Sequence, residues 1–572
     1  MYKRFYGIGD SLKAQDGRLS NHYRCFDMNY DLIIKNGTVV DGTGNLWFKA
    51  DVAIENGKIA RVGRSLRGEN IADAKGMIAC PGFIDPHTHT DLVLLCSEPE
   101  RTSLFRGIIK QGITTEVIGN CGFSAAPTKA DTKELLQRQL GFLSPPEELS
   151  WDWSTFGEYL NLLENKRLPV NIVPLVGQGT VKVAVMGYED RSPSEDELKE
   201  MKTLVAEAMK NGAVGLSTGL VYSPGMITST QEVVELCKIV ARYNGVYVSH
   251  IRGFDYNLVN STNEAIAIGR DSGIPVNISH FGVYGTQFWG MAKYALHIID
   301  EAREIGVDVA FDLIPYTTGN TLIASLFPTW AQEGGVEKLV NRLKDPAIRE
   351  RIEREMETVV PGWPPVWPVN FVKLIGWEGI FLASCMTQEN KPLEGKNFTE
   401  IGMMKGKAPF DALCDLVIEE RAKAWITVYV WREDDVRAML KHPACSICTD
   451  ALDVGSGKPH PAAYQTSPRV LDYYVKKEKV LSLEEAIRKM TSLPAQRYKL
   501  RDRGLIAEGF WADIVIFDPK TMIDYSSYDE PRQCARGIEY VLLNGEIVAA
   551  KGQVEKEVLC GKVLRRTEAG VE

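Results

Sequence analysis

Two histidines separated by a single residue, His87 and His89, could bind a metal ion together. They follow an apolar run, residues 77–84, which contains Pro81 and Gly82. Alternate residues of an extended chain point to the same side, so both imidazoles can reach one ion from the end of a strand. Two polar histidines on a loop would show the same spacing, and the pair alone favours neither interpretation.

Further residues of these chemical kinds occur where buried strands are expected to end. The chain has only eight histidines in 572 residues, so their placement is informative. The side chains that follow or end a predicted strand are His87, His89, Cys121, His250, His280 and Asp450. In a parallel barrel the carboxyl ends of the strands form one rim, where active sites lie. The sequence therefore predicts that these six side chains share one site.

Imidazole and thiolate ligands suit a borderline-soft divalent ion, zinc first, with manganese or iron as the alternatives. We expect one or two ions, and Cys121 could bridge a pair as a thiolate. A divalent ion in such a site activates water near neutral pH and polarises a carbonyl group. Asp450 has no positively charged neighbour in the sequence, and we predict that it acts as general base and then as general acid. The alternative role for this aspartate is a helix cap.

The elements that would position these side chains alternate between buried strands and amphipathic helices. The helical patterns cover residues 195–211, 231–244, 260–271 and 293–305. Eight short apolar runs are predicted strands, at residues 80–86, 114–119, 170–176, 213–218, 246–250, 275–280, 307–313 and 445–450. A doubly wound open sheet would alternate in the same way. The count of eight and the ligand positions favour an α/β fold built on a (β/α)8 TIM-like barrel.

Both ends of the chain are rich in short β patterns, and Asn36-Gly37 and Asn56-Gly57 are typical of hairpin turns. We predict that the two ends meet in one small β-sandwich. A long connection before the last barrel strand is predicted to be an insertion that acts as a lid. The predicted divisions are an N-terminal extension at 1–27, a β-sandwich from 28–79 and 500–560, and a metal-dependent barrel at 80–499 with its insertion at 317–440.

The composition argues against several classes of function. A net charge of −9 argues against a nucleic-acid or anionic-membrane surface. No apolar run is long enough to span a bilayer, and residues 1–26 lack the apolar middle of a secretory signal. Eleven scattered cysteines argue against a disulfide framework and for a reducing, cytoplasmic location. We expect a small-molecule substrate and, from the fold class and the N-terminal arm, a homo-oligomer.

Seven motifs between about residues 31 and 553 carry a resemblance to a known family. They are Pro81-Gly-Phe-Ile-Asp-Pro-His-Thr-His, Gly112-Ile-Thr-Thr-Glu-Val-Ile-Gly-Asn-Cys-Gly-Phe-Ser, Gly212-Ala-Val-Gly-Leu-Ser-Thr-Gly-Leu, His250-Ile-Arg, Ile278-Ser-His, Thr449-Asp450 and Ser467-Pro-Arg-Val-Leu. With these motifs the sequence resembles the amidohydrolase superfamily, and within it the N-acyl-D-amino-acid deacylase (D-aminoacylase) branch. The resemblance implies a paired metal site on His87, His89, Cys121, His250 and His280, with Asp450 as the catalytic base.

The positions that would face the substrate depart from that family's pattern. The family has His-Pro-Arg where this chain has His460-Pro461-Ala462, and the guanidinium that would grip a substrate carboxylate is absent. The other departures are Ile314 before Pro315-Tyr316, Asn320-Thr321, Gln178 between two glycines, and Val221-Tyr222 after Gly219-Leu220. We infer a small substrate without a free α-carboxylate.

The predicted function is therefore hydrolytic opening of a small, neutral cyclic substrate at a carbonyl. A cyclic 1,3-diketone such as dihydrophloroglucinol fits, as does a cyclic amide or imide. One alternative is an N-acyl-D-amino-acid deacylase that binds its carboxylate differently, and another is a non-catalytic barrel that acts as a binding module. The candidate pocket donors, each equally compatible with a packing role, are Arg252, Tyr222, Gln178, Tyr316 and His460. Lys182 lies too far past its strand to be proposed as a carboxylated bridging ligand.

Overall fold

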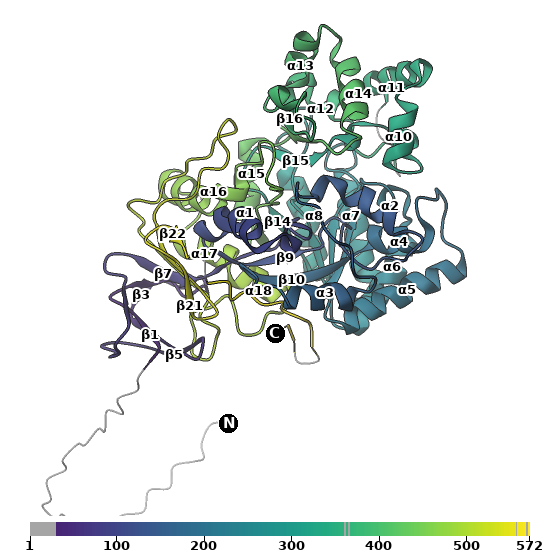
Figure 1. Cartoon of the computed structure of the whole chain (residues 1–572). Coiled ribbons are helices and arrows are strands. Elements are labelled where there is room, and N and C mark those ends of the chain that lie inside the picture. Colours follow the sequence, from purple (N-terminus) through teal and green to yellow (C-terminus); the bar gives the residue numbers. More distant parts are fainter. Residues whose placement is uncertain (1–29, 360–361, 364–366, 556–557, 568–569, 572) are drawn as a thin grey trace, which may run out of the picture.

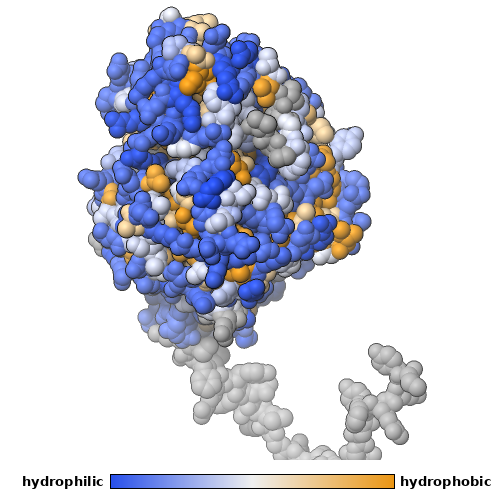
Figure 2. Space-filling model, turned by 90° about the vertical axis from the view of Figure 1, so that its right-hand side faces the viewer, coloured by the Kyte–Doolittle hydropathy of each residue, from blue (hydrophilic) through white to orange (hydrophobic). Residues whose placement is uncertain are grey.

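The computed structural model describes residues 30–359, 362–363, 367–555, 558–567 and 570–571 (Figure 1). The predicted N-terminal extension, residues 1–27, lies outside the described residues. None of the described helices is both long enough and apolar enough to cross a membrane. Figure 2 shows a face on which hydrophilic residues predominate and hydrophobic ones form small separate groups.

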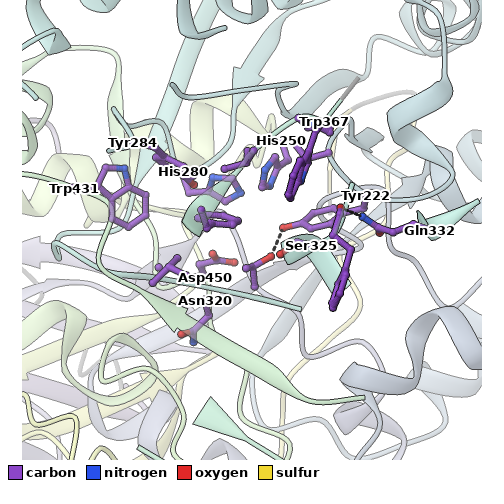
Figure 3. Close-up of a pocket in the computed structure, with 18 residues that line it drawn as sticks. Tyr222, His250, His280, Tyr284, Asn320, Ser325, Gln332, Trp367, Trp431 and Asp450 are labelled. Atoms are coloured by element: carbon purple, nitrogen blue, oxygen red, sulfur yellow. Dashed lines mark hydrogen bonds between the residues drawn. The ribbon is translucent and has the colours of Figure 1, made fainter. Parts of the chain in front are cut away.

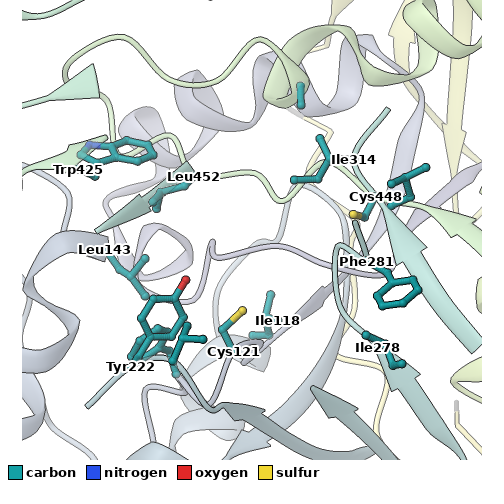
Figure 4. Close-up of a cluster of buried hydrophobic side chains, with 14 of the residues drawn as sticks. Ile118, Cys121, Leu143, Tyr222, Ile278, Phe281, Ile314, Trp425, Cys448 and Leu452 are labelled. Carbon is teal, nitrogen blue, oxygen red and sulfur yellow. The ribbon is translucent and has the colours of Figure 1, made fainter. Parts of the chain in front are cut away.

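Eight parallel strands form the central sheet, which confirms the predicted barrel. In spatial order they are β8 (Phe83–Asp85), β9 (Ile113–Ile118), β10 (Asn171–Gly177), β11 (Gly215–Gly219), β12 (Val246–His250), β13 (Val276–Ile278), β14 (Val309–Leu313) and β18 (Cys445–Ile447). All seven residues of β10 are buried, as expected for a parallel strand that is covered on both faces. A buried hydrophobic cluster includes Ile118, Ile278, Phe281 and Cys448, which come from three parts of the barrel (Figure 4).

The barrel closes just beyond the ends of its first and last strands. An isolated parallel bridge pairs Thr88 with Ala451. The His89 amide donates to the Ala451 carbonyl at 3.0 Å, and the Asp450 amide donates to the His87 carbonyl, also at 3.0 Å. This seam brings the two histidines that follow β8 against the aspartate that follows β18.

Helices cover the outside of the barrel, and the four predicted ones are present. They are α5 (Glu195–Lys210), α6 (Thr230–Arg242), α7 (Leu258–Ser272) and α8 (Ala292–Glu304). The start of α5 is fixed by a capping box, in which the Ser194 side chain accepts from the Glu197 amide and the Glu197 carboxylate accepts from the Ser194 amide. Ser229 caps α6 by accepting from the Glu232 amide.

Two further sheets, built from both ends of the chain, pack face to face beside the barrel. In spatial order, the strands of the first sheet are β5 (Lys58–Gly63), β4 (Asp51–Glu55), β1 (Leu32–Lys35) and β6 (Ile71–Asp73). Those of the second are β22 (Gln553–Val554), β21 (Glu546–Ala550), β20 (Ile538–Leu543), β19 (Ile514–Phe517), β7 (Ile78–Pro81), β2 (Thr38–Val39) and β3 (Phe48–Lys49). In the second sheet β7 (Ile78–Pro81) pairs with β19 (Ile514–Phe517), so residues more than 400 positions apart lie side by side. Side chains from both sheets share one core, as in a sandwich. The exact domain boundaries remain predictions.

The run at residues 80–86, predicted as one barrel strand, is divided between two sheets. Its first part belongs to β7 in the sandwich, and only β8 lies in the barrel. Gly82 stands between them, and a Cβ there would lie 2.3 Å from Thr114 Oγ1. The two predicted hairpins differ. Asn56-Gly57 does join β4 (Asp51–Glu55) to β5 (Lys58–Gly63), but Asn36-Gly37 carries the chain from one sheet to the other, so that prediction was wrong.

The insertion at 317–440 forms a layer at one end of the barrel, at the top of Figure 1. It contains the antiparallel sheet β15 (Gly319–Leu322), β17 (Trp425–Val428) and β16 (Ile380–Ser384). Two helices of the insertion follow each other closely, α10 (Val336–Arg342) and α11 (Pro346–Thr358). Asp345 caps the second helix and proline occupies its first turn, so the first helix cannot continue.

Candidate metal centre

The sulfur of Cys121 lies at the centre of the strand ends. Its Sγ is 3.3 Å from His87 Nε2, 3.7 Å from His250 Nδ1 and 3.6 Å from His280 Nε2. Two buried groups of potential ligands result, His87-His89-Cys121 and Cys121-His250-His280, and they share the sulfur. The structure therefore brings together all five residues that the sequence suggested as ligands.

The protonation states of these side chains suit a metal ion. Burial lowers the pKa of His87, His250 and His280, which favours the unprotonated imidazole whose lone pair can bind a cation. Burial also raises the pKa of the Cys121 thiol well above its usual value, and Asp450 raises it further. A bound divalent cation deprotonates a coordinating thiol outright. The donor set thus fits a divalent metal.

Asp450 faces the same cluster from the last strand. Its Oδ1 lies 3.5 Å from His87 Nε2 and 3.4 Å from His89 Nε2. Burial acts to raise the pKa of Asp450, but the imidazoles of His87, His89 and His280 outweigh it and hold that pKa below its usual value. The carboxylate is therefore ionised and can accept a proton.

Three of these residues have backbone conformations that non-glycine residues rarely adopt. The φ angles are +53° at Cys121, +33° at His280 and +50° at Asp450. Such left-handed residues cost free energy and persist where the surroundings hold them. The holding contacts include the Asp450 amide on the His87 carbonyl, at 3.0 Å, and the His280 amide on Asp312 Oδ1, at 2.6 Å.

Two buried acids behind the cluster were missed by the sequence reasoning. Asp85 Oδ1 accepts from the His87 and Thr449 amides at 3.2 and 3.1 Å, so one carboxylate anchors both sides of the barrel seam. Asp312 accepts from the His280 amide and, at 2.6 Å, from Asn277 Nδ2. Burial raises the pKa of both to about 7. An acid inside an otherwise apolar strand was the signal that could have found them.

A cavity opens beside the cluster, between the barrel rim and the insertion (Figure 3). It contains about 530 Å³ of empty space, counted out to the solvent. The barrel contributes Tyr222, His250, His280, Tyr284 and Asp450, and the insertion contributes residues of 319–332, 367–371 and 428–431. The Tyr222 hydroxyl is hydrogen-bonded to Thr321 Oγ1 at 3.1 Å. No lysine or arginine is among the described residues that line the cavity.

Of the five candidate pocket donors, only Tyr222 lines this cavity. Arg252 is paired with Glu264 at 2.9 Å and donates to the Met226 carbonyl at 3.0 Å. Gln178 Nε2 donates to Thr228 Oγ1 at 3.0 Å and to Glu232 Oε1 at 3.3 Å. Both side chains are thus bonded to other protein groups and do not line the cavity.

His460 and Tyr316 also lie outside the cavity lining. His460 Nδ1 accepts from the Ala462 amide at 3.0 Å, so the ring proton is on Nε2, which lies 2.6 Å from Thr318 Oγ1. Burial lowers the pKa of His460 to about 4 and keeps the ring neutral. The Tyr316 hydroxyl is hydrogen-bonded to Ser526 at 2.8 Å. Lys182 is buried in an ion pair with Glu232 at 3.0 Å.

Aromatic residues that the sequence reasoning did not single out form much of the cavity wall. Tyr284 stacks on Phe254 with ring centres 4.6 Å apart, and meets Trp431 edge-on at 5.5 Å. Trp367 lines the opposite part of the cavity in Figure 3. Trp367 and Trp431 lie in the insertion, and no local sequence pattern predicts that the insertion lies over the barrel rim.

A family model described as "Amidohydrolase family" matches residues 70–361 and 384–549, and one described as "Urease alpha-subunit, N-terminal domain" matches residues 3–82. The N-acyl-D-glutamate deacylase of Alcaligenes xylosoxydans xylosoxydans is 32% identical, over 94% of this chain and 96% of the relative.

Solved structures agree with these matches. An N-acyl-D-glutamate deacylase from Bordetella bronchiseptica, complexed with zinc and a phosphonate inhibitor, has a TM-score of 0.77 at 30% identity. A D-aminoacylase with a binuclear metal centre has a TM-score of 0.76 at 30% identity. Both similarities cover 94% of this chain and 100% of the solved chain.

Proposed function

The chain belongs to the amidohydrolase family, in its D-aminoacylase branch, and we propose that it opens a small, neutral cyclic substrate by hydrolysis at a carbonyl. The substrate class is a cyclic 1,3-diketone, or a cyclic amide or imide. The observation that carries the proposal is that no cationic side chain lines the cavity among the described residues.

A carboxylate in this cavity would be desolvated without a charged partner. Burying an unpaired charge is strongly unfavourable, and carboxylate sites are normally built on an arginine fork. Arg252, the arginine among the candidate pocket donors, is already paired with Glu264. At position 462, where the family has arginine, the alanine is fully buried at the start of α16 (Ala462–Pro468). A cyclic amide or imide, or a diketone that is bound in its neutral form, avoids this penalty.

The residues of the centre have separate roles in this proposal. His87, His89, Cys121, His250 and His280 would hold one or two divalent ions, zinc first, with manganese or iron as alternatives; such ions polarise a carbonyl and activate water. Asp450 takes a proton from the attacking water and returns it to the leaving atom. In a diketone the C–C bond beside the attacked carbonyl breaks and its carbon takes the proton, whereas in an amide the nitrogen takes it.

The comparisons favour a second candidate, an N-acyl-D-amino-acid deacylase. The matched relatives carry deacylase names and are similar over nearly their whole length. In this case Asp450 would return the proton to the amine, and the carboxylate would be bound by groups other than a lining lysine or arginine. A non-catalytic binding module is disfavoured, because its metal ligands and Asp450 would have no reason to converge.

A substrate panel separates the two candidates. Purified protein is loaded with zinc or manganese and assayed on cyclic 1,3-diketones, lactams, cyclic imides and N-acetyl-D-amino acids. We expect ring opening, seen as a single open-chain product that carries one new carboxyl group and contains all atoms of the substrate plus one water. Release of free D-amino acid, with no ring opened across the panel, would instead establish the deacylase and overturn the proposal.

A further inference from the structure

Tyr222 lies between two cavities, the one beside the metal ligands (the reaction cavity) and a second one. Tyr222 and Gln332 line both. The second cavity contains about 400 Å³ of empty space, counted out to the solvent, and its wall is mostly apolar, with Phe123, Phe142 and Leu339 among its residues. None of the five metal ligands is among the described residues that line it. Tyr222 and Gln332 therefore form the boundary between the reaction cavity and an apolar space beside it.

The ring of Tyr222 contacts one aromatic residue of each cavity. It meets His250, which lines the reaction cavity, edge-on with ring centres 4.9 Å apart. It meets Phe123, which lines the second cavity, with ring centres 5.2 Å apart. Its hydroxyl is hydrogen-bonded to Thr321 Oγ1 of the insertion at 3.1 Å, and Figure 3 shows Tyr222 and Gln332 on the same side of the reaction cavity. The phenol ring thus occupies the space between the two cavities.

Two buried cations hold the segment 220–229, which carries this tyrosine. Arg252 Nη1 donates to the Met226 carbonyl at 3.0 Å, and Arg252 Nη2 donates to the Thr228 carbonyl. Lys182 Nζ donates to the Thr228 hydroxyl at 3.3 Å. Each cation is also paired with a buried glutamate. Breaking such contacts is costly because a charge would stay buried with fewer partners. The segment is therefore fixed from below, and the boundary between the cavities with it.

We propose that Tyr222 is a specificity-determining residue, which separates the two cavities and keeps rings with a bulky substituent from the metal centre. Such a substituent would need the volume that the phenol ring fills, and overfilling a packed site forces neighbouring groups out of place. Without the phenol ring, the second cavity would become continuous with the first, and its apolar wall suits an alkyl or aryl group. This inference rests on the proposed function for its choice of substrate.

The test compares two rings that differ by one phenyl group, 1,3-cyclohexanedione and its 5-phenyl derivative, on the metal-loaded protein. Wild-type protein should open the parent ring in strong preference to the substituted one. In Tyr222→Ala, the kcat/KM for the substituted ring relative to the parent ring should rise by on the order of ten-fold or more. The affinity for the substituted ring, measured by calorimetry, should rise with it. Tyr294→Ala, at a residue 54% exposed on the outer helix α8, is the matched control and should change neither value.

A second substitution refills the space that the first one opens. Ala324 lines the second cavity and not the reaction cavity. Ala324→Leu in the Tyr222→Ala protein should therefore reverse the gain, which a general loosening of the fold would not allow. Tyr222→Leu, which keeps an apolar side chain, replaces the alanine variant if that variant does not fold, and should give a smaller gain in the same direction. Metal content, measured for each variant, should equal that of wild type.

An unchanged preference in the Tyr222 variants, with metal bound, would overturn this inference and leave ring opening standing. Wild-type protein that opens both rings equally well would overturn it too. If the substrate panel establishes the deacylase instead, the same proteins are compared on N-acetyl-D-alanine and N-phenylacetyl-D-alanine, where the phenyl group is on the acyl side. The failure of ring opening is thus distinguished from the failure of the size limit.

Discussion

The Asp450 carboxylate is charged in a place where burial alone would neutralise it. It stays ionised because three imidazoles surround it. Asp450→Asn keeps the shape and removes the base, so kcat should fall by about 10²–10⁴-fold. Metal content, measured by plasma mass spectrometry, should stay at the wild-type level. Asp529→Asn, at a side chain 96% exposed, makes the same chemical change outside the site and should be silent. Full turnover in the Asp450→Asn variant would remove the base assignment.

His460 should make the protein less stable in acid. Its folded pKa is about 4, below the usual 6.5, so the unfolded chain binds the proton first. The associated stability is complete above pH 6.5 and is lost as pH falls towards 4. It amounts to about 3 kcal/mol, from a shift of about 2.5 pKa units at 1.36 kcal/mol each.

His460→Asn keeps an acceptor for the Ala462 amide but does not titrate. Melting temperatures of the metal-free proteins, followed from pH 7 to pH 4, should fall less steeply for this variant than for wild type. Parallel pH profiles of the two proteins would show that His460 does not contribute to acid unfolding.

The β4–β5 and β20–β21 hairpins of the β-sandwich contact each other at Gly57 and Gly545. Gly57 has φ +76°, and a Cβ there would lie 2.7 Å from the Asn544 carbonyl oxygen; Gly76 has φ +80° but no atom within 4 Å of an added Cβ. Gly57→Ala should therefore destabilise the protein by at least ~2 kcal/mol, whereas Gly76→Ala bears only the conformational penalty of ~1 kcal/mol. Urea unfolding followed by tryptophan fluorescence measures both. Equal losses would mean that the turn contact relaxes freely.

The barrel elements could be predicted because their signals are local. Apolar runs of strand length alternate with helical patterns, and polar residues such as His250 and His280 end the strands. Other features depend on contacts between distant segments. The change of sheet at Gly82 is set by pairing between β7 and β19. The engagement of Arg252 by Glu264 depends on how α7 packs, and the cavity wall depends on where the insertion places Trp367 and Trp431.

A buried polar network connects the two ends of the chain to the barrel, away from the metal ligands. Asn171 at the start of β10 accepts from Asn544 Nδ2 at 2.9 Å and donates to Asp513 Oδ2 at 3.3 Å. Arg503 forms an ion pair with Asp513, and both side chains are at most 4% exposed. In barrel enzymes the amino-terminal face of the strands serves stability and the carboxyl-terminal face serves chemistry. The sandwich is therefore joined to the barrel at the end that carries no reaction.

The metal centre connects the barrel strands at their opposite, carboxyl-terminal ends. Its ligands lie at the ends of β8, β9, β12 and β13 and adjoin the barrel seam. An ion that binds only the folded chain stabilises it by about 2.7 kcal/mol at a hundred times its dissociation constant. Removing it with a chelator should lower the melting temperature by several degrees, roughly 2–4 °C per kcal/mol for a large domain. Adding zinc or manganese back should restore it.

Two histidine variants make this test specific. His87→Asn removes a ligand and should melt at the chelated temperature whether or not chelator is present. His297→Asn, at a side chain 69% exposed on the outer helix α8, should respond to the chelator as wild type does. The predicted link between the metal and the fold would be wrong if chelation removed the ions without changing the melting temperature. Stability would then come from the protein contacts across the seam alone, those between His87 and Asp450 and between His89 and Ala451.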